Sequence, residues 1–147
     1  MYSNDYIGKI VILKNIVFNR GKNKLDHAYK GGRPCLLIYS DEEYDYFLTI
    51  TSEVKNKSYE FEYYKLNPDD FLYLYNYRGD NSKVNFDYIH GYVNMFEIYK
   101  KRISGYGFHD FGKIKLETFK DIMEKFKFLH NKENMEQIIN KASIMGK

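Results

Sequence analysis

The sequence predicts one small α+β domain that is rich in β-strands, in which a barrel of short strands is closed by helices at its C-terminal end. Many short segments with strand-like apolar patterns precede a C-terminal third in which apolar residues recur at helical spacing. The chain has 147 residues, of which 18% are aromatic. That length suits a single domain spanning 1–147, and that composition is too apolar for a disordered chain.

The expected strands occupy the first two-thirds of the chain. They are 8–13, 34–39, 44–51, 59–66, 71–75, 83–88 and 93–99. A polar loop, 19–32, joins the first two strands, and polar turns are expected at 41–43 and 78–81. Because side chains alternate along a strand, 44–51 should have two distinct faces. These faces carry Tyr46, Leu48 and Ile50 on one side, and Phe47, Thr49 and Thr51 on the other.

The C-terminal third predicts one long helix and one short helix. The apolar face of the long helix consists of Leu116, Phe119, Ile122, Met123, Phe126 and Leu129. Phe119 and Phe126 are expected to lie in the core. A break follows at Asn131, and the apolar spacing of Met135, Ile138, Ile139 and Ala142 predicts the second helix.

Charge and cysteine content set broad limits on function. The formal net charge is +3, which permits a polyanionic partner without requiring one. Cys35 is the only cysteine, so we expect no disulfide within the chain, a reducing cytoplasmic setting and a buried thiol. We expect no signal peptide and no membrane span, since no run approaches the roughly 18 apolar residues that a span needs.

The segment from Lys30 to Ile38 carries the most chemical information. Gly31 and Gly32 allow a sharp turn or a close approach to a ligand, and Arg33 follows at the start of a strand. Its guanidinium is suited to gripping a phosphate, although a surface salt bridge is the simpler interpretation. His27 in the preceding loop is a candidate general acid or base, or else a solvated loop histidine.

Hydroxyl groups gather where the third expected strand ends. Thr49, Thr51 and Ser52 are either solvated strand residues or hydrogen-bond donors to a phosphate or sugar oxygen. The four histidines are His27, His90, His109 and His130. Their spacing matches no metal-binding pattern and no cysteine pair accompanies them, so no metal or other cofactor is expected.

Several of these segments, in this order, resemble the MazF/PemK family of toxin endoribonucleases. The matching segments are 8–11, 32–38, 49–53, 82–86, 95–103 and 112–126. They include the glycine-led first strand, the Gly-Arg-Pro junction, the threonine-ended strand, a serine-led strand and a closing strand and helix. The match covers 7–129 and leaves 130–147 as a C-terminal helical extension.

The resemblance implies a homodimeric SH3-like barrel that cleaves single-stranded RNA without a metal ion and leaves a 2′,3′-cyclic phosphate. It maps the catalytic pair onto Arg33 and Thr51, with Thr49 as the substitute if the register differs by two. Further catalytic or RNA-binding positions are His27, Lys30, Gly32, Ser52 and Ser82. The implied partner is a cognate antitoxin, a protein rather than an RNA.

Two other classes of function stay open. The first is a barrel without catalytic activity that binds protein or nucleic acid through an aromatic surface. The second is a topoisomerase-inhibiting barrel of similar fold. A related endoribonuclease regulated by an RNA antitoxin is a variant of the leading hypothesis.

Overall fold

A computed structural model of the chain describes residues 7–13, 33–51, 54, 57–74, 91–103, 110–131 and 134–144. The strands are β1 (Lys9–Leu13), β2 (Arg33–Ser40), β3 (Tyr44–Thr51), β4 (Tyr63–Lys65), β5 (Phe71–Leu74), β6 (Tyr92–Asn94), β7 (Tyr99–Arg102), β8 (Asp110–Ile114) and β9 (Ser143–Ile144). The helices are α2 (Leu116–Leu129) and α3 (Met135–Ile139), and two 3-10 turns are η2 (Lys57–Glu62) and η3 (Pro68–Asp70).

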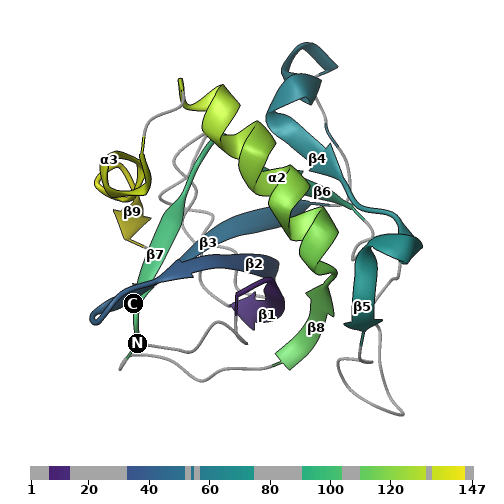
Figure 1. The fold of residues 1–147 in the computed structure, drawn as a ribbon, viewed down its shortest axis with the longest axis horizontal. Coiled ribbons are helices and arrows are strands. Elements are labelled where there is room, and N and C mark those ends of the chain that lie inside the picture. Colours follow the sequence, from purple (N-terminus) through teal and green to yellow (C-terminus); the bar gives the residue numbers. More distant parts are fainter. Residues whose placement is uncertain are drawn as a thin grey trace, which may run out of the picture.

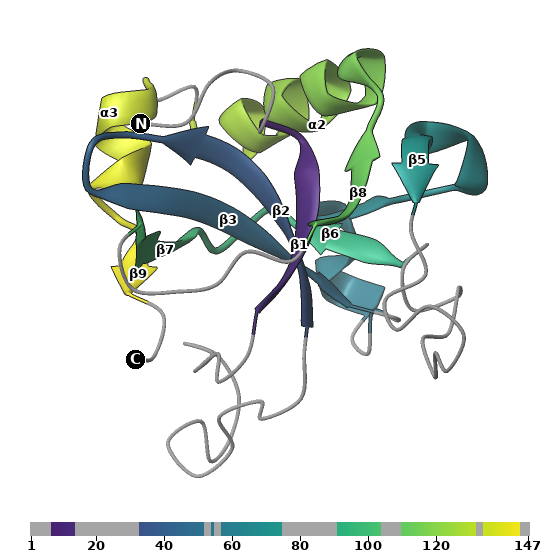
Figure 2. The same ribbon diagram turned by 90° about the horizontal axis from the view of Figure 1, so that it is seen from below.

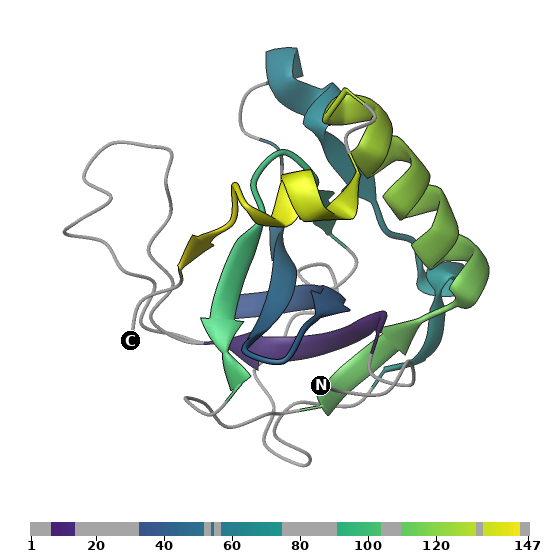
Figure 3. The ribbon, with the colours of Figure 1, turned by 60° about the vertical axis from the view of Figure 1, so that its left-hand side comes forward.

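The strands form one curled, largely antiparallel sheet, in the order β4-β6-β3-β2-β1-β8-β5 (Figure 1). β7 pairs with the first half of β3, and β9 pairs with β7 in the single parallel contact among the described strands. Figure 2 shows α2 and α3 on the same side of the β2–β3 hairpin. Figure 3 shows α3 and β9 beside β7. The predicted strand-rich α+β class with a C-terminal helix is therefore confirmed.

Apolar side chains pack in two clusters on opposite faces of the sheet. The main cluster includes Leu48, Ile50 and Phe126, so it joins one face of β3 to α2. The second, smaller cluster includes Cys35 and Phe47. The predicted alternation along β3 is confirmed, and Cys35 is fully buried as expected.

The helix α2 buries most of its predicted apolar face. Ile122 and Phe126 are fully buried, whereas Phe119 is only partly buried at the edge of the main cluster. Leu116 was expected to face the core, and that expectation was wrong, because this first residue of the helix is 65% exposed. The helix ends at the predicted break, where Asn131 has a φ of 59°.

The C-terminal extension contributes to the same core as the sheet and α2. The predicted second helix is α3, which begins after Asn134, whose side chain accepts a hydrogen bond from the backbone N–H of Gln137. Ile138 of this helix is fully buried in the main cluster. The pairing of β9 with β7 further ties the extension to the sheet.

Two predicted strands were wrong in part. In the expected strand 59–66, most of the segment forms η2, and only Tyr63–Lys65 is a strand. The alternating rings that predicted the strand do not all face a core, since Phe61 is 67% exposed. The expected strand 93–99 is divided into β6 and β7, which pair with different parts of β3, and Asn94 accepts a hydrogen bond from Phe96 N at the bend between them.

The turn between β2 and β3 is organised by one carboxylate. Asp41 accepts hydrogen bonds from the backbone N–H groups of Tyr44 and Glu43, each at 2.8 Å, and from the Tyr46 hydroxyl at 2.7 Å. Burial alone would raise the pKa of Asp41, but these donors outweigh burial and hold that pKa below its usual value. The predicted polar turn at 41–43 is confirmed, whereas the expected loop 19–32, turn 78–81 and strand 83–88 lie outside the described residues.

Candidate active site at one end of the sheet

The two predicted catalytic residues lie on neighbouring strands, β2 and β3. Arg33 is the first residue of β2 and pairs with Leu13 of β1, while Thr51 is the last residue of β3. β2 and β3 are antiparallel with Cys35 opposite Thr49. This is the last described pair of the two strands, and Arg33 and Thr51 each lie two residues beyond it. The β2–β3 pairing therefore brings two positions that are 18 residues apart in the sequence to the same end of the hairpin.

A row of paired residues runs across the sheet from Thr51. Thr51 pairs with Tyr92 of β6, and Tyr92 pairs with Lys65 of the edge strand β4. We call this the end row, and its members are Thr51, Tyr92 and Lys65. Neighbouring strands lie about 4.8 Å apart, so the two steps from Thr51 to Lys65 cover roughly 10 Å.

The end row belongs to the face of the sheet that points away from α2. The adjacent row contains Ile50, Val93 and Tyr64, all of which are in or against the main cluster beneath α2. Because successive side chains alternate, the end row lies on the opposite face. Thr51 is half-buried there and Lys65 is exposed, so this part of the face is open to solvent.

The two candidate threonines differ in how deeply they are buried. Thr49 is only 2% exposed and pairs with Cys35 inside the sheet, so its hydroxyl is not presented to a substrate. Thr51 is half-buried at the end of its strand. Of the two, Thr51 has the placement that substrate contact requires.

Most of the other candidate site residues cannot be placed relative to Arg33 and Thr51. His27, Lys30, Gly32, Ser52 and Ser82 lie outside the described residues. The described histidine, His130, has Nε2 at 2.9 Å from the carbonyl oxygen of Met95, and its ring packs against Phe126 with centroids 4.5 Å apart. His130 is therefore a structural residue at the end of α2.

No pattern in the sequence singles out Tyr92 or Lys65 as a site residue. Both residues enter the end row because of the strand order in the sheet. β6 follows β4 in the chain, yet it lies between β3 and β4 in the sheet. Tyr64 precedes Lys65 in the chain but points to the other face, where its hydroxyl donates to Asp121 Oδ2 of α2 at 2.7 Å. Burial first, and then this hydrogen bond, raise the pKa of Tyr64 above that of an ordinary tyrosine.

The described part of the chain contains no group of three or more acidic, histidine or cysteine side chains placed to hold a metal ion. Within the same residues, no helix is long and apolar enough to cross a membrane. The chain matches no protein-family model, and a search of curated proteins finds no relative.

Proposed function

We propose that this chain is the toxin of a toxin–antitoxin system and cleaves single-stranded RNA without a metal ion. The observation that supports the proposal is the antiparallel pairing of β2 and β3, in which Arg33 begins β2 and Thr51 ends β3 at the same end of the hairpin. The curled sheet with a C-terminal helix supports the finer proposal of an SH3-like barrel of the MazF/PemK type. A homodimer and a protein antitoxin complete the proposal, with the cytoplasm as its location.

In the proposed reaction, the RNA's own 2′-hydroxyl oxygen attacks the adjacent phosphorus and loses its proton to a base or to water. The bond from phosphorus to the 5′-oxygen of the next nucleotide breaks, and that oxygen takes up a proton. The products are a 2′,3′-cyclic phosphate and a 5′-hydroxyl. Arg33 stabilises the additional negative charge on the phosphoryl oxygens in the transition state.

Thr51 has a positional role in this reaction. Its hydroxyl donates a hydrogen bond to a phosphate oxygen and orients it beside Arg33. A threonine hydroxyl is a poor general base at its ordinary pKa, so proton transfer is assigned to another group. His27 is the candidate from the sequence for that transfer.

A binding module without catalytic activity is the second candidate function. The observation in its favour is the exposure of large aromatic side chains on the described surface. Phe61 is 67% exposed and Phe128 is 73% exposed. Rings this exposed on one surface are typical of a binding surface.

The test is cleavage of a mixed-sequence single-stranded RNA by purified protein in EDTA. Arg33→Ala should reduce the cleavage rate about 100- to 1000-fold, the effect of removing a preorganised transition-state donor. Thr51→Val should also slow cleavage, whereas Thr51→Ser should keep most of the rate because it retains the hydroxyl. Arg102→Ala removes an exposed arginine that pairs with Glu43 on another part of the sheet and is the matched control.

Fragments ending in a 2′,3′-cyclic phosphate, made by wild type and Arg102→Ala but not by Arg33→Ala, would support the proposal. If folded wild-type protein leaves every RNA intact, the endoribonuclease proposal fails and the binding module becomes the leading account. If Arg33→Ala cleaves as fast as wild type, the assignment of the catalytic pair is wrong.

A further inference from the structure

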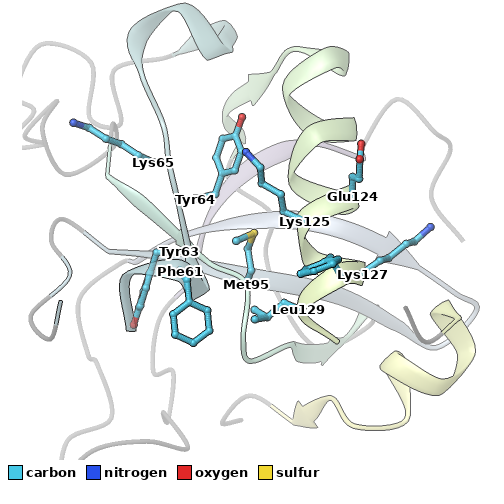
Figure 4. Close-up of a pocket in the computed structure, with 10 residues that line it drawn as sticks. Phe61, Tyr63, Tyr64, Lys65, Met95, Glu124, Lys125, Lys127 and Leu129 are labelled. Carbon is cyan, nitrogen blue, oxygen red and sulfur yellow. The ribbon is translucent and has the colours of Figure 1, made fainter. Parts of the chain in front are cut away.

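A groove of about 1180 Å³ lies between the edge strand β4 and the C-terminal half of α2 (Figure 4). One wall comes from η2 and β4 and includes Phe61, Tyr63 and Lys65. The other wall comes from α2 and includes Lys127 and Phe128. The groove thus joins two segments that are more than fifty residues apart in the chain.

Aromatic side chains in this groove are exposed rather than packed into a core. Phe61 and Phe128 are 67% and 73% exposed, and they come from opposite walls. Burying a ring of this size is favourable, so two exposed rings beside one cavity indicate a surface that a ligand covers. Flat rings of this kind can stack on the bases of an unpaired nucleic acid strand.

The charge on the groove favours an anionic ligand. Three lysines line it, Lys65, Lys125 and Lys127, against the single carboxylate of Glu124. Lys125 is engaged, because its Nζ lies 3.4 Å from Asp121 Oδ2 and 4.9 Å from the centroid of the Tyr64 ring.

Lys65 and Lys127 differ from Lys125 in their interactions. Neither forms an ion pair with another described residue. Figure 4 shows them projecting outward at the two sides of the groove. These lysines are therefore available to phosphate groups at both sides of the exposed rings.

Lys65 connects the groove to the end row. It lines the groove and also pairs with Tyr92, which pairs with Thr51. In Figure 4 its side chain points away from α2, which agrees with the face assigned to the end row. A strand of RNA held at Thr51 can therefore reach the groove by passing over Tyr92 and Lys65, a distance of roughly 10 Å.

We propose that the groove between β4 and α2 binds the segment of single-stranded RNA that flanks the cleaved phosphate. The inference rests on the proposed endoribonuclease function for its ligand. Phe61 and Phe128 stack on unpaired bases, and Lys65 and Lys127 neutralise phosphates. The continuity with the end row favours RNA over an acidic peptide, since a peptide ligand gives no reason for the groove to lead to Thr51.

The test measures binding apart from cleavage. Fluorescence anisotropy of a labelled, mixed-sequence, fully 2′-O-methylated RNA reports affinity, because this RNA lacks the nucleophile and cannot be cut. Phe61→Ala or Phe128→Ala should each weaken binding by about 5- to 150-fold, the loss of stacking on one base. A plot of log K against log salt has a negative slope. The double variant Lys65→Ala/Lys127→Ala should make this slope shallower by about 1.4, or about 0.7 for each lost phosphate contact.

Matched controls remove similar groups from other places. Leu116→Ala removes an exposed apolar side chain at the opposite end of α2, and Lys120→Ala removes an exposed lysine from the same helix outside the groove. Both should bind the RNA like wild type. Because all of these positions are exposed, melting temperatures should match that of wild type, which excludes unfolding as the cause.

The outcomes separate this inference from the proposed activity. If the groove variants bind RNA like wild type while wild type cleaves it, the groove inference fails and the activity stands. If they lose binding while wild type binds but never cleaves, the groove stands and the endoribonuclease proposal fails. If wild type does not bind the RNA at all, the groove inference is overturned, and an acidic peptide becomes the ligand to test.

Discussion

Replacing Phe126 with alanine should remove a large part of the free energy of unfolding. The Phe126 side chain is fully buried in the main cluster, and its ring centroid lies 4.5 Å from that of His130. The change loses the transfer free energy of the ring and leaves a cavity, together about 3–5 kcal/mol. A domain of this size has about 5–15 kcal/mol in total, so the variant should be barely stable.

The assay is urea unfolding followed by circular dichroism, with a thermal scan beside it. For Phe126→Ala the urea midpoint should fall with little change in slope, and the melting temperature should fall by about 6–20 °C. Phe128→Ala is the matched control, because it makes the same change two residues away on the same helix at a side chain that is 73% exposed. Its free energy of unfolding should stay within about 0.5 kcal/mol of wild type.

Equal losses in the two variants would refute the assignment of which face of α2 meets the sheet. A loss below about 1 kcal/mol for Phe126→Ala would refute the packing itself, since a fully buried ring cannot be removed at so small a cost.

Three further predictions, each measured by urea unfolding, concern the Asp41 carboxylate, the Tyr64 hydroxyl and the backbone at Gly8. The carboxylate of Asp41 stabilises the fold above its unfolded pKa of about 3.9 and loses that effect as pH falls through its lower folded pKa. Asp41→Asn should therefore make the free energy of unfolding depend less steeply on pH in acid. The same pH dependence in both proteins would contradict this. Tyr64→Phe should cost about 0.5–1.5 kcal/mol by removing the bond to Asp121. The raised pKa of Tyr64 contributes stability that is present below about pH 10 and is lost as pH rises through the folded pKa. If wild type and Tyr64→Phe lose stability equally as the pH rises above about 10, this contribution is absent. Gly8→Ala should cost about 1–2 kcal/mol, because Gly8 has a φ of 89°, which residues other than glycine rarely adopt. A free energy of unfolding equal to that of wild type would contradict this.

Several features of this protein could be predicted from the sequence because they depend on local pattern. The bounds of β3 and α2 follow from alternation and helical spacing, and the burial of Cys35 follows from the apolar run around it. The position of Arg33 at the start of a strand was also predicted, because proline after it suits the beginning of a strand. The resemblance then directed attention to Thr51.

Other features depended on which strands meet. Phe61 and Tyr63 alternate like strand residues, yet Phe61 lies in a 3-10 turn with an exposed ring, since no neighbouring element buries it. A single strand was expected over 93–99, but β6 and β7 pair with different parts of β3. Pairing of this kind is a long-range choice that the residues of one segment do not encode.

The sequence by itself determined a strand-rich α+β chain with a C-terminal helix, and it selected Arg33 and Thr51 as the pair to test. Only the tertiary structure decided that these positions lie at the same end of the β2–β3 hairpin, that Thr49 is buried, and that a row runs from Thr51 through Tyr92 to Lys65. The physical reason is that side-chain period is local, whereas strand order and register are set by the burial of both sheet faces at once.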